Sequence, residues 1–455
     1  MNLRMIAACL VATGLAIGSA GAEEGGGKLR YTLAPGREWT YRSTVGLEGA
    51  PMRYEVNWKV WAIGREPDGS WRLVIRCDMA ARRTAPDGRG APSRSESLVW
   101  RCRMFEDGAL VGVHAMGTAR DPSRLFPRLP ENADERNRGW TSAGDAETST
   151  THHHRVAPGA PADGDVLTIV TRSECPQDRV FVASHECLAT FDARRGAVTR
   201  IETRDDSEYL QQHSRGVTEL VGIEDRGGDW AASFGREADA YFAATEAYDA
   251  AHQRATRDAG RSQSLMEGAK AGLEQARRGL DAEIFRGQID RKLSDHAETA
   301  KYAAEEAASR ASRIGAAAPE WEAADLDGKV RRLADYRGKV VVLDFWYRGC
   351  GWCMHAMPQV ARLAETFRDR PVAVLGVSTD KDEKDARAVA KAMGLMHPTI
   401  RAGDVDSRYG VESFPTLIVI DKAGKIREFR VGYSPHLYED LEPLIRELAA
   451  ERPAG

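Results

Sequence analysis

Two cysteines with two residues between them are the part of this sequence best suited to chemistry. They are Cys350 and Cys353, and apolar residues recur at helical spacing from this pair to Phe367. The first cysteine therefore begins a helix, where unpaired N–H groups and the helix dipole stabilise a thiolate and lower its pKa. The second cysteine lies one turn further on and can attack a mixed disulfide. The spacing predicts thiol–disulfide exchange, with Cys350 as nucleophile and Cys353 as resolving thiol.

Three other interpretations of the pair stay open at this point. A zinc site needs four ligands, and His355 stands alone nearby, without a second Cys-x-x-Cys in the chain. A purely structural disulfide is a second alternative, although a three-residue spacing at a helix start is unusual for one. A peroxidatic cysteine is the third, and it would have a threonine three residues earlier, where this chain has Tyr347.

A buried strand must hold the cysteine pair in place. Residues 340–346 are almost all apolar and β-branched or aromatic, which is typical of a strand buried on both faces. Asp344 is the exception, and a carboxyl group in an apolar setting has a raised pKa. We expect it to accept the proton of Cys353 as a general base. A structural role, bonding nearby backbone, is the alternative.

Several ordered segments carry a resemblance to a known family. They are Ala318-Pro319-Glu320-Trp321 with Asp327-Gly328-Lys329, residues 337–346, Phe414-Pro415-Thr416 and residues 421–426. Through them, residues 315–452 resemble a thioredoxin-fold domain of the TlpA/ResA type, the extracytoplasmic thiol–disulfide oxidoreductases. The resemblance implies a cis-proline loop at Phe414-Pro415 that faces the disulfide. It also implies that Asp344 stands where thioredoxin has its buried carboxylate, and that no cofactor is needed beyond the redox-active disulfide.

Two departures from the family pattern bear on partner choice and redox potential. Tyr347-Arg348-Gly349 replaces the usual run before the pair, and Trp352 stands where proline is common. With Phe414 and Pro415, Trp352 is a predicted substrate-binding residue. Its backbone N–H, which proline lacks, is expected to stabilise the thiolate and make the disulfide more oxidising.

Two features bear on whether the protein reduces or oxidises its substrates, and the Trp352 N–H favours oxidation. The TlpA/ResA resemblance and Asp344 favour a reductase of exported cysteine-containing proteins, recharged by a membrane thiol-reducing carrier. We expect a midpoint potential of about −270 to −180 mV. An isomerase or oxidant of the same fold is one alternative. An envelope binding or sensor protein, with the N-terminal domain as its main functional unit, is another.

The start of the chain predicts export. In residues 1–22, Arg4 precedes an apolar run from Met5 to Ile17, and Ala20-Gly21-Ala22 forms a small-residue cleavage site. The run is short for a membrane span, although an uncleaved N-terminal anchor is the alternative. A periplasmic or other extracytoplasmic location follows. The 64 basic and 68 acidic residues nearly balance, so there is no electrostatic footprint for nucleic acid.

An oxidising compartment favours structural disulfides. Four further cysteines remain after cleavage: Cys77, Cys102, Cys175 and Cys187. We expect the pairs Cys77–Cys102, on neighbouring strands, and Cys175–Cys187, on either side of a short loop and strand. Four cysteines allow three connectivities, so this pairing is one of three.

The chain length of 455 residues suits two or three domains. Short alternating strands separated by turns predict an antiparallel all-β domain over 23–235, either a sandwich or an open barrel. Residues 236–314 are rich in alanine and predict a helical connector, most simply a hairpin, through which the protein could self-associate. Residues 315–455 form the predicted α/β redox domain.

Three consecutive histidines, His152-His153-His154, are a candidate metal site. Adjacent residues on a strand point to opposite faces, so three in a row cannot converge on one ion. The favoured interpretation is an exposed strand edge or loop, and no metal is predicted.

Overall fold

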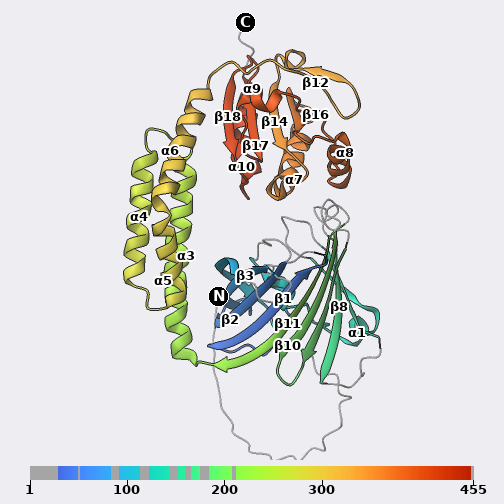
Figure 1. The fold of residues 1–455 in the computed structure, drawn as a ribbon, viewed down its shortest axis with the longest axis vertical. Coiled ribbons are helices and arrows are strands. Elements are labelled where there is room, and N and C mark those ends of the chain that lie inside the picture. Colours follow the sequence, from blue (N-terminus) through green and yellow to red (C-terminus); the bar gives the residue numbers. More distant parts are fainter. Residues whose placement is uncertain are drawn as a thin grey trace, which may run out of the picture.

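The computed structural model consists of a curved sheet, a group of helices and an α/β domain, in that order along the chain (Figure 1). It describes residues 29–49, 52–83, 92–112, 122–143, 151–158, 165–174, 184–207 and 212–451. The predicted signal segment 1–22 and Cys175 lie outside these ranges.

The N-terminal part is one antiparallel sheet of eleven strands, not the two packed sheets of a sandwich. The strands are β1 (Arg37–Leu47), β2 (Met52–Arg65), β3 (Trp71–Arg83), β4 (Pro92–Met104), β5 (Leu110–Val111), β6 (Trp140–Ala143), β7 (Thr151–Val156), β8 (Val166–Glu174), β9 (Ser184–Asp192), β10 (Ala197–Ser207) and β11 (Gln212–Asp225). Their order is β5-β4-β3-β2-β1-β11-β10-β9-β8-β7-β6. The first strand therefore pairs with the last, and the sheet curves around a single core.

Alternation along the strands decides which residues fill that core. On β2, Val56, Trp58 and Val60 point inward with Trp39 of β1, and the residues between them point out. Phe126, directly after the short helix η2 (Pro122–Leu125), packs into the same core. The short helix α1 (Ala133–Arg138) follows it and precedes β6.

The predicted Cys77–Cys102 disulfide is wrong. The two cysteines do lie on the paired strands β3 and β4, but Cys77 stands opposite Leu98 and Cys102 opposite Leu73. That offset of four residues separates the two Cα atoms by roughly 13 Å along the strand, well beyond the 4.4–6.8 Å that a disulfide spans. Cys187 lies on β9. Because its predicted partner is outside the described ranges, that pair stays a prediction.

The histidine triplet lies on β7 with alternating directions. His154 is buried, not exposed as expected: its ring stacks on Trp140 at 5.3 Å and its Nδ1 lies 2.9 Å from Thr171 Oγ1. Burial lowers the pKa of His154 to about 3. Within the described ranges, no group of three or more His, Cys, Asp and Glu side chains is placed to hold a metal ion.

The connector holds four helices, not a simple hairpin. They are α3 (Gly228–Ala255), α4 (Ser262–Arg278), α5 (Glu283–Ser294) and α6 (His296–Arg313). Phe285 is fully buried among them, with ring centroids 5.0 Å from Phe234 and 5.1 Å from Tyr241. Trp61 and Val74, on the outer face of the sheet, belong to the same apolar core. No helix in the described part of the chain is long and apolar enough to cross a membrane.

The C-terminal domain is a five-stranded sheet covered by helices. Its strands are β14 (Val340–Trp346), β15 (Val372–Ser378), β16 (Thr399–Arg401), β17 (Thr416–Ile420) and β18 (Ile426–Val431), in the order β16-β15-β14-β17-β18. The helices are α7 (Gly351–Thr366), α8 (Glu383–Ala392), α9 (Val405–Tyr409) and α10 (Leu437–Ala450). A small hairpin of β12 (Glu322–Ala324) and β13 (Val330–Arg332), with the turn η3 (Leu333–Tyr336), precedes them.

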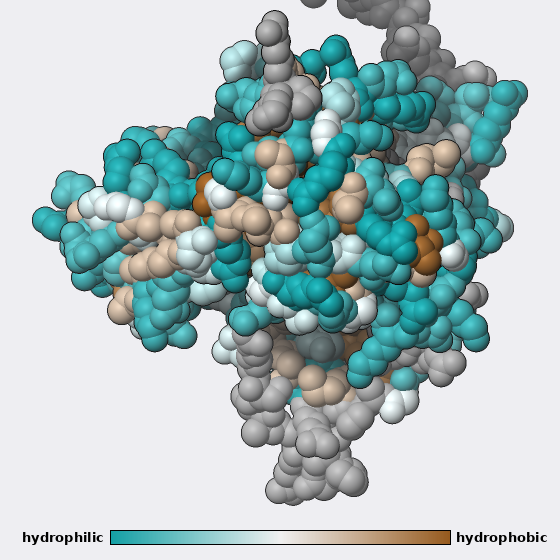
Figure 2. Space-filling model, turned by 90° about the horizontal axis from the view of Figure 1, so that it is seen from above, coloured by the Kyte–Doolittle hydropathy of each residue, from teal (hydrophilic) through white to brown (hydrophobic). Residues whose placement is uncertain are grey.

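The arrangement of this domain is the expected thioredoxin fold. All seven residues of the central strand β14 are buried, as its sequence predicts. One face of the sheet is covered by α7 and α10, which contribute Val360 and Leu441 to a shared core. The short elements β16 and α9 were not predicted. The face turned away from the curved sheet is mainly hydrophilic (Figure 2).

Candidate active site

The two cysteines form a disulfide at the N-terminus of α7, with their Cα atoms 5.2 Å apart. Cys350 is the N-cap of that helix, and its Sγ accepts a hydrogen bond from the backbone N–H of Cys353 at 3.1 Å. A donor aimed at this sulfur stabilises negative charge on it when the disulfide opens. The helix dipole acts in the same direction.

The two sulfurs differ in access. Cys350 is 6% exposed and Cys353 is 1% exposed, so the first cysteine of the pair is the one that a partner can reach. Both lie in an apolar cluster with Trp346 of β14 and Met354 and Met357 of α7. This packing fixes the pair and leaves one edge of it at the surface. Access and charge stabilisation therefore select the same sulfur, that of Cys350, as nucleophile.

Asp344 is buried in the middle of the central strand. It is 2% exposed. Its side chain lies on the same face of the strand as Val340 and Val342, the face that α7 and α10 cover. Its Oδ1 has no hydrogen-bond partner among the described residues. Burial raises the pKa of Asp344 to about 7. A carboxyl group with such a pKa, on the face of the sheet under the cysteine helix, can exchange a proton near neutral pH.

The predicted proline loop is present beside the disulfide. The Phe414–Pro415 peptide bond is cis, and Phe414 packs against the apolar cluster that contains both cysteines. The Phe414 ring also makes a T-shaped contact with the ring of Tyr347, in the turn before Cys350, with the ring centroids 5.3 Å apart. The backbone N–H of Gly432 donates to the Pro415 carbonyl at 2.8 Å. The loop, the turn and the start of α7 thus meet around one disulfide.

Trp352 is the most exposed of the predicted site residues, at 51%. Its indole stacks on Tyr433 with centroids 5.4 Å apart and planes 19° from parallel. The His355 ring lies 5.7 Å from it. The residue that directly precedes Cys353 thus carries an exposed aromatic ring. Sequence reasoning identified Trp352 but missed His355 and Tyr433 as its neighbours.

A carboxylate that the sequence did not indicate holds the turn before Cys350. Both Asp380 carboxylate oxygens accept from the backbone N–H of Arg348, at 2.9 and 3.1 Å, and Ser378 Oγ donates to the same group at 2.9 Å. The Arg348 guanidinium reaches Asp385 at 2.7 Å. Burial raises the pKa of Asp380. The available signal was topological, because β15 runs parallel to β14 and the two strands end at one edge.

Comparison with known proteins finds matches over this domain. Residues 314–429 match the model of the AhpC/TSA family. The thiol-disulfide oxidoreductase ResA of Geobacillus thermodenitrificans is 35% identical over 121 residues, which are 26% of this chain and 70% of that protein. The thioredoxin-like protein YneN of Bacillus subtilis is also 35% identical over 121 residues, 26% of this chain and 71% of that one.

A solved structure, the thioredoxin domain of a thiol-disulfide oxidoreductase from Bacteroides vulgatus, is 30% identical. The match covers 29% of this chain and 97% of the solved one, with a TM-score of 0.28.

Proposed function

The chain belongs, through its C-terminal domain, to the ResA-type family of thiol-disulfide oxidoreductases, and from this premise we propose that it reduces disulfides of exported proteins outside the cytoplasm. The observation that carries the proposal is the hydrogen bond from the Cys353 N–H to the sulfur of Cys350, the more exposed residue of the pair. It favours Cys350 as the leaving and attacking thiolate. The Cys-Gly-Trp-Cys motif is then the whole redox centre, and no further cofactor is needed.

The proposed reaction balances as a two-electron exchange. The Cys350 thiolate attacks one sulfur of a substrate disulfide and releases the other as a thiolate. Cys353 then attacks the Cys350 sulfur, which closes the intramolecular disulfide and releases the second substrate thiol. Asp344 accepts the proton that Cys353 loses in this step. A membrane thiol-reducing carrier supplies the two electrons that reopen the disulfide.

Trp352, Phe414 and Pro415 are the proposed substrate-binding residues. The exposed indole of Trp352 and the ring of Phe414 flank the pair and offer apolar contact to residues beside the substrate cysteine. The carbonyl of Pro415 accepts from Gly432 and is held in place.

Export is proposed from residues 1–22, whose sequence has the three regions of a secretory signal. Expression of the full chain in a bacterial host, followed by N-terminal sequencing of the periplasmic fraction, tests this. A mature protein that starts after Ala22 supports export. Retention of the intact N-terminus in the cytoplasmic fraction contradicts it.

The direction of the reaction is tested by redox titration. Equilibration of the full chain with glutathione buffers is expected to give a midpoint of about −270 to −180 mV. A midpoint near −120 mV, the range of a strong oxidant, would contradict a reductase. Isomerase activity is the rival within the expected range. The two activities are distinguished by incubation with a protein that has scrambled disulfides, without added reductant. An isomerase restores the native disulfides under these conditions.

A further inference from the structure

We propose that the helical connector is a rigid brace that holds the Cys350 side of the redox domain toward the curved sheet. In this arrangement, extended cysteine-containing segments reach the disulfide and folded proteins are kept away from it. The statement about substrates rests on the proposed thiol–disulfide exchange. The brace itself rests only on contacts between the three parts of the chain.

The connector is attached to the sheet without a flexible linker. Only two residues separate β11 from α3, and one of them, Arg226, donates to the buried carboxylate of Glu38 at 2.6 Å. The same guanidinium lies 5.2 Å above the ring of Trp230 on α3. Further along α3, Phe234 packs on Trp61 of the sheet with centroids 5.2 Å apart. The start of α3 is therefore fixed in position and in direction.

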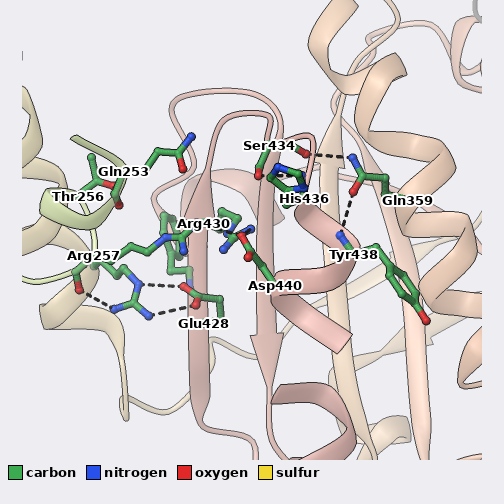
Figure 3. A network of polar contacts seen from close by, with 12 residues as sticks. Gln253, Thr256, Arg257, Gln359, Glu428, Arg430, Ser434, His436, Tyr438 and Asp440 are labelled. Atoms are coloured by element: carbon green, nitrogen blue, oxygen red, sulfur yellow. Dashed lines mark hydrogen bonds and ion pairs between the residues drawn. The ribbon is translucent and has the colours of Figure 1, made fainter. Parts of the chain in front are cut away.

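The other end of the connector is attached to the redox domain by ion pairs (Figure 3). Arg310 of α6 binds both carboxylate oxygens of Glu428 on β18, at 2.8 and 3.1 Å. Arg257, just after α3, lies 3.3 Å from Asp440 of α10, which also pairs with Arg430 at 2.9 Å. The side chains of Arg310 and Glu428 are only 21% and 13% exposed, so water and salt weaken this pair less than a surface pair.

The chain between α6 and the redox domain adds a third attachment. The backbone N–H of Gly315 donates to the Ile426 carbonyl at 2.7 Å, and that of Ile426 donates to Ala316 at 2.9 Å. The Ala318 N–H donates to Gly424 at 2.8 Å. These residues extend the edge of the sheet beside β18 instead of forming a free linker. One helix, α3, thus runs for about 42 Å from the curved sheet to the redox domain, at 1.5 Å per residue.

The orientation of the redox domain follows from strand directions. Both β14 and β18 pair antiparallel with β17, so they run the same way. The helix α10 follows β18, returns along the sheet and ends on the side away from the curved sheet (Figure 1). The C-terminal end of β14 and the start of α7, with Cys350 as its N-cap, therefore face the curved sheet.

This orientation restricts what can reach the nucleophile. Attack needs a substrate disulfide in line with the sulfur of Cys350, a residue that is only 6% exposed. The proposed brace keeps the curved sheet on the side toward which the Cys350 end of the redox domain points, so we expect a substrate to approach between the two. An extended segment meets this condition more readily than a cysteine on the surface of a folded protein.

The test compares the wild type with a variant in which the brace is released. The released variant combines Arg257→Gln and Arg310→Gln with a flexible Gly-Ser insertion between Ile314 and Gly315. A matched control, Lys301→Gln with Glu305→Gln, removes an exposed ion pair of α6 that lies within the helix. Spin labels are attached through non-natural amino acids at Asn57, on β2, and Glu447, on α10, both exposed.

The first readout is the distribution of distances between the labels. The proposal expects one narrow distribution in the wild type and the control, and a broad one in the released variant. A wild-type distribution as broad as that of the released variant would overturn the brace. This readout does not depend on catalysis.

The second readout is the rate of reduction of one disulfide peptide, either free or displayed as a loop of a small folded protein. The wild type is expected to reduce the free peptide at least about tenfold faster, and the released variant to lose most of that preference. An unchanged preference in the released variant would overturn the steric part of the proposal. Turnover of neither substrate would overturn the proposed function, and the distance measurement would still decide the brace.

Discussion

Asp344 lies in an apolar environment that its residue type seldom occupies. The sequence placed it in a buried strand, and the structure buries it with one oxygen lacking a hydrogen-bond partner among the described residues. Its position six residues before Cys350 and its apolar surroundings were readable from the sequence. Its raised pKa follows from the same burial.

Replacement of Asp344 by asparagine is expected to change how stability depends on pH. The pKa is about 7 in the folded chain and about 3.9 in the unfolded chain, so the folded state holds a proton that the unfolded state releases between pH 4 and 7. Stability therefore falls as pH rises through this window, by about 4 kcal/mol in all, and stays level above it.

Asp344→Asn removes this loss. Denaturation of the oxidised protein should show the variant a few kcal/mol more stable than the wild type at pH 8 and close to it at pH 4. The same stability difference at both pH values would mean that the folded-state pKa is not raised. Reduction of a substrate by Asp344→Asn should also be slower, with a shifted pH profile, if the carboxylate accepts the Cys353 proton.

Other features of single residues could not be predicted from the sequence. Asp380 holds the turn before Cys350, yet it comes from a different strand end and nothing in its own segment marks it. The error over Cys77 and Cys102 has a similar cause. Their strands do pair as expected, but strand register decides which residues face each other, and a shift of four residues is invisible in the pattern of alternation.

At the level of elements, the start of α7 sets the chemistry of the pair. The first turn of a helix leaves its backbone N–H groups without helical partners. In this turn the N–H of Cys353 donates to the Cys350 sulfur. Trp352 contributes a further N–H to the same turn, and proline at this position has none. The sequence predicted this helix start correctly because the apolar spacing begins at the pair itself.

Trp352→Pro is expected to make the disulfide harder to reduce. Loss of a donor near the thiolate destabilises the reduced form, and the midpoint should become more negative by about 30 mV, which corresponds to about 1.4 kcal/mol. Titration against glutathione measures it, with Trp352→Ala as the control that removes the ring and keeps the N–H. An equal shift in both variants would assign the effect to the indole stacked on Tyr433.

The helical connector depends on one aromatic centre. Phe285 is fully buried between Phe234 and Tyr241, so Phe285→Ala should cost about 3–5 kcal/mol through lost burial and the cavity left behind. Denaturation followed by far-UV circular dichroism measures the loss. Tyr302→Ala, at a residue that is 48% exposed, is the matched control and should lie within about 0.5 kcal/mol of the wild type. Equal effects would place the core of the connector elsewhere.

Elements with one strong pattern were predictable, and those defined by packing were not. The buried strand β14 and the helix α7 match their expected ranges because their apolar residues are continuous or periodic. The four helices of the connector were underestimated because alanine-rich segments favour helix throughout and mark their ends weakly. The short β16 and α9 have too few residues to show a period.

At the level of the whole molecule, the three parts were predicted but their relative orientation was not. The contacts that fix it, such as Arg310 with Glu428, join charged residues 118 positions apart, and such residues look like ordinary solvent-exposed ones in a sequence. The named relatives match only the C-terminal domain, so they are silent on this arrangement. The curved sheet and the connector are therefore where this chain differs from a single-domain oxidoreductase.

In the proposed reaction, Cys350 attacks a substrate disulfide and Cys353 resolves the adduct. The most direct test mixes full-length Cys353→Ser and Cys350→Ser variants, separately, with an oxidised protein substrate and separates the products without reductant. Cys353→Ser should accumulate a mixed disulfide that mass spectrometry maps to Cys350, and Cys350→Ser should accumulate none. Adducts through Cys353 in the Cys350→Ser variant, or full insulin-reducing activity in Cys350→Ala, would contradict it.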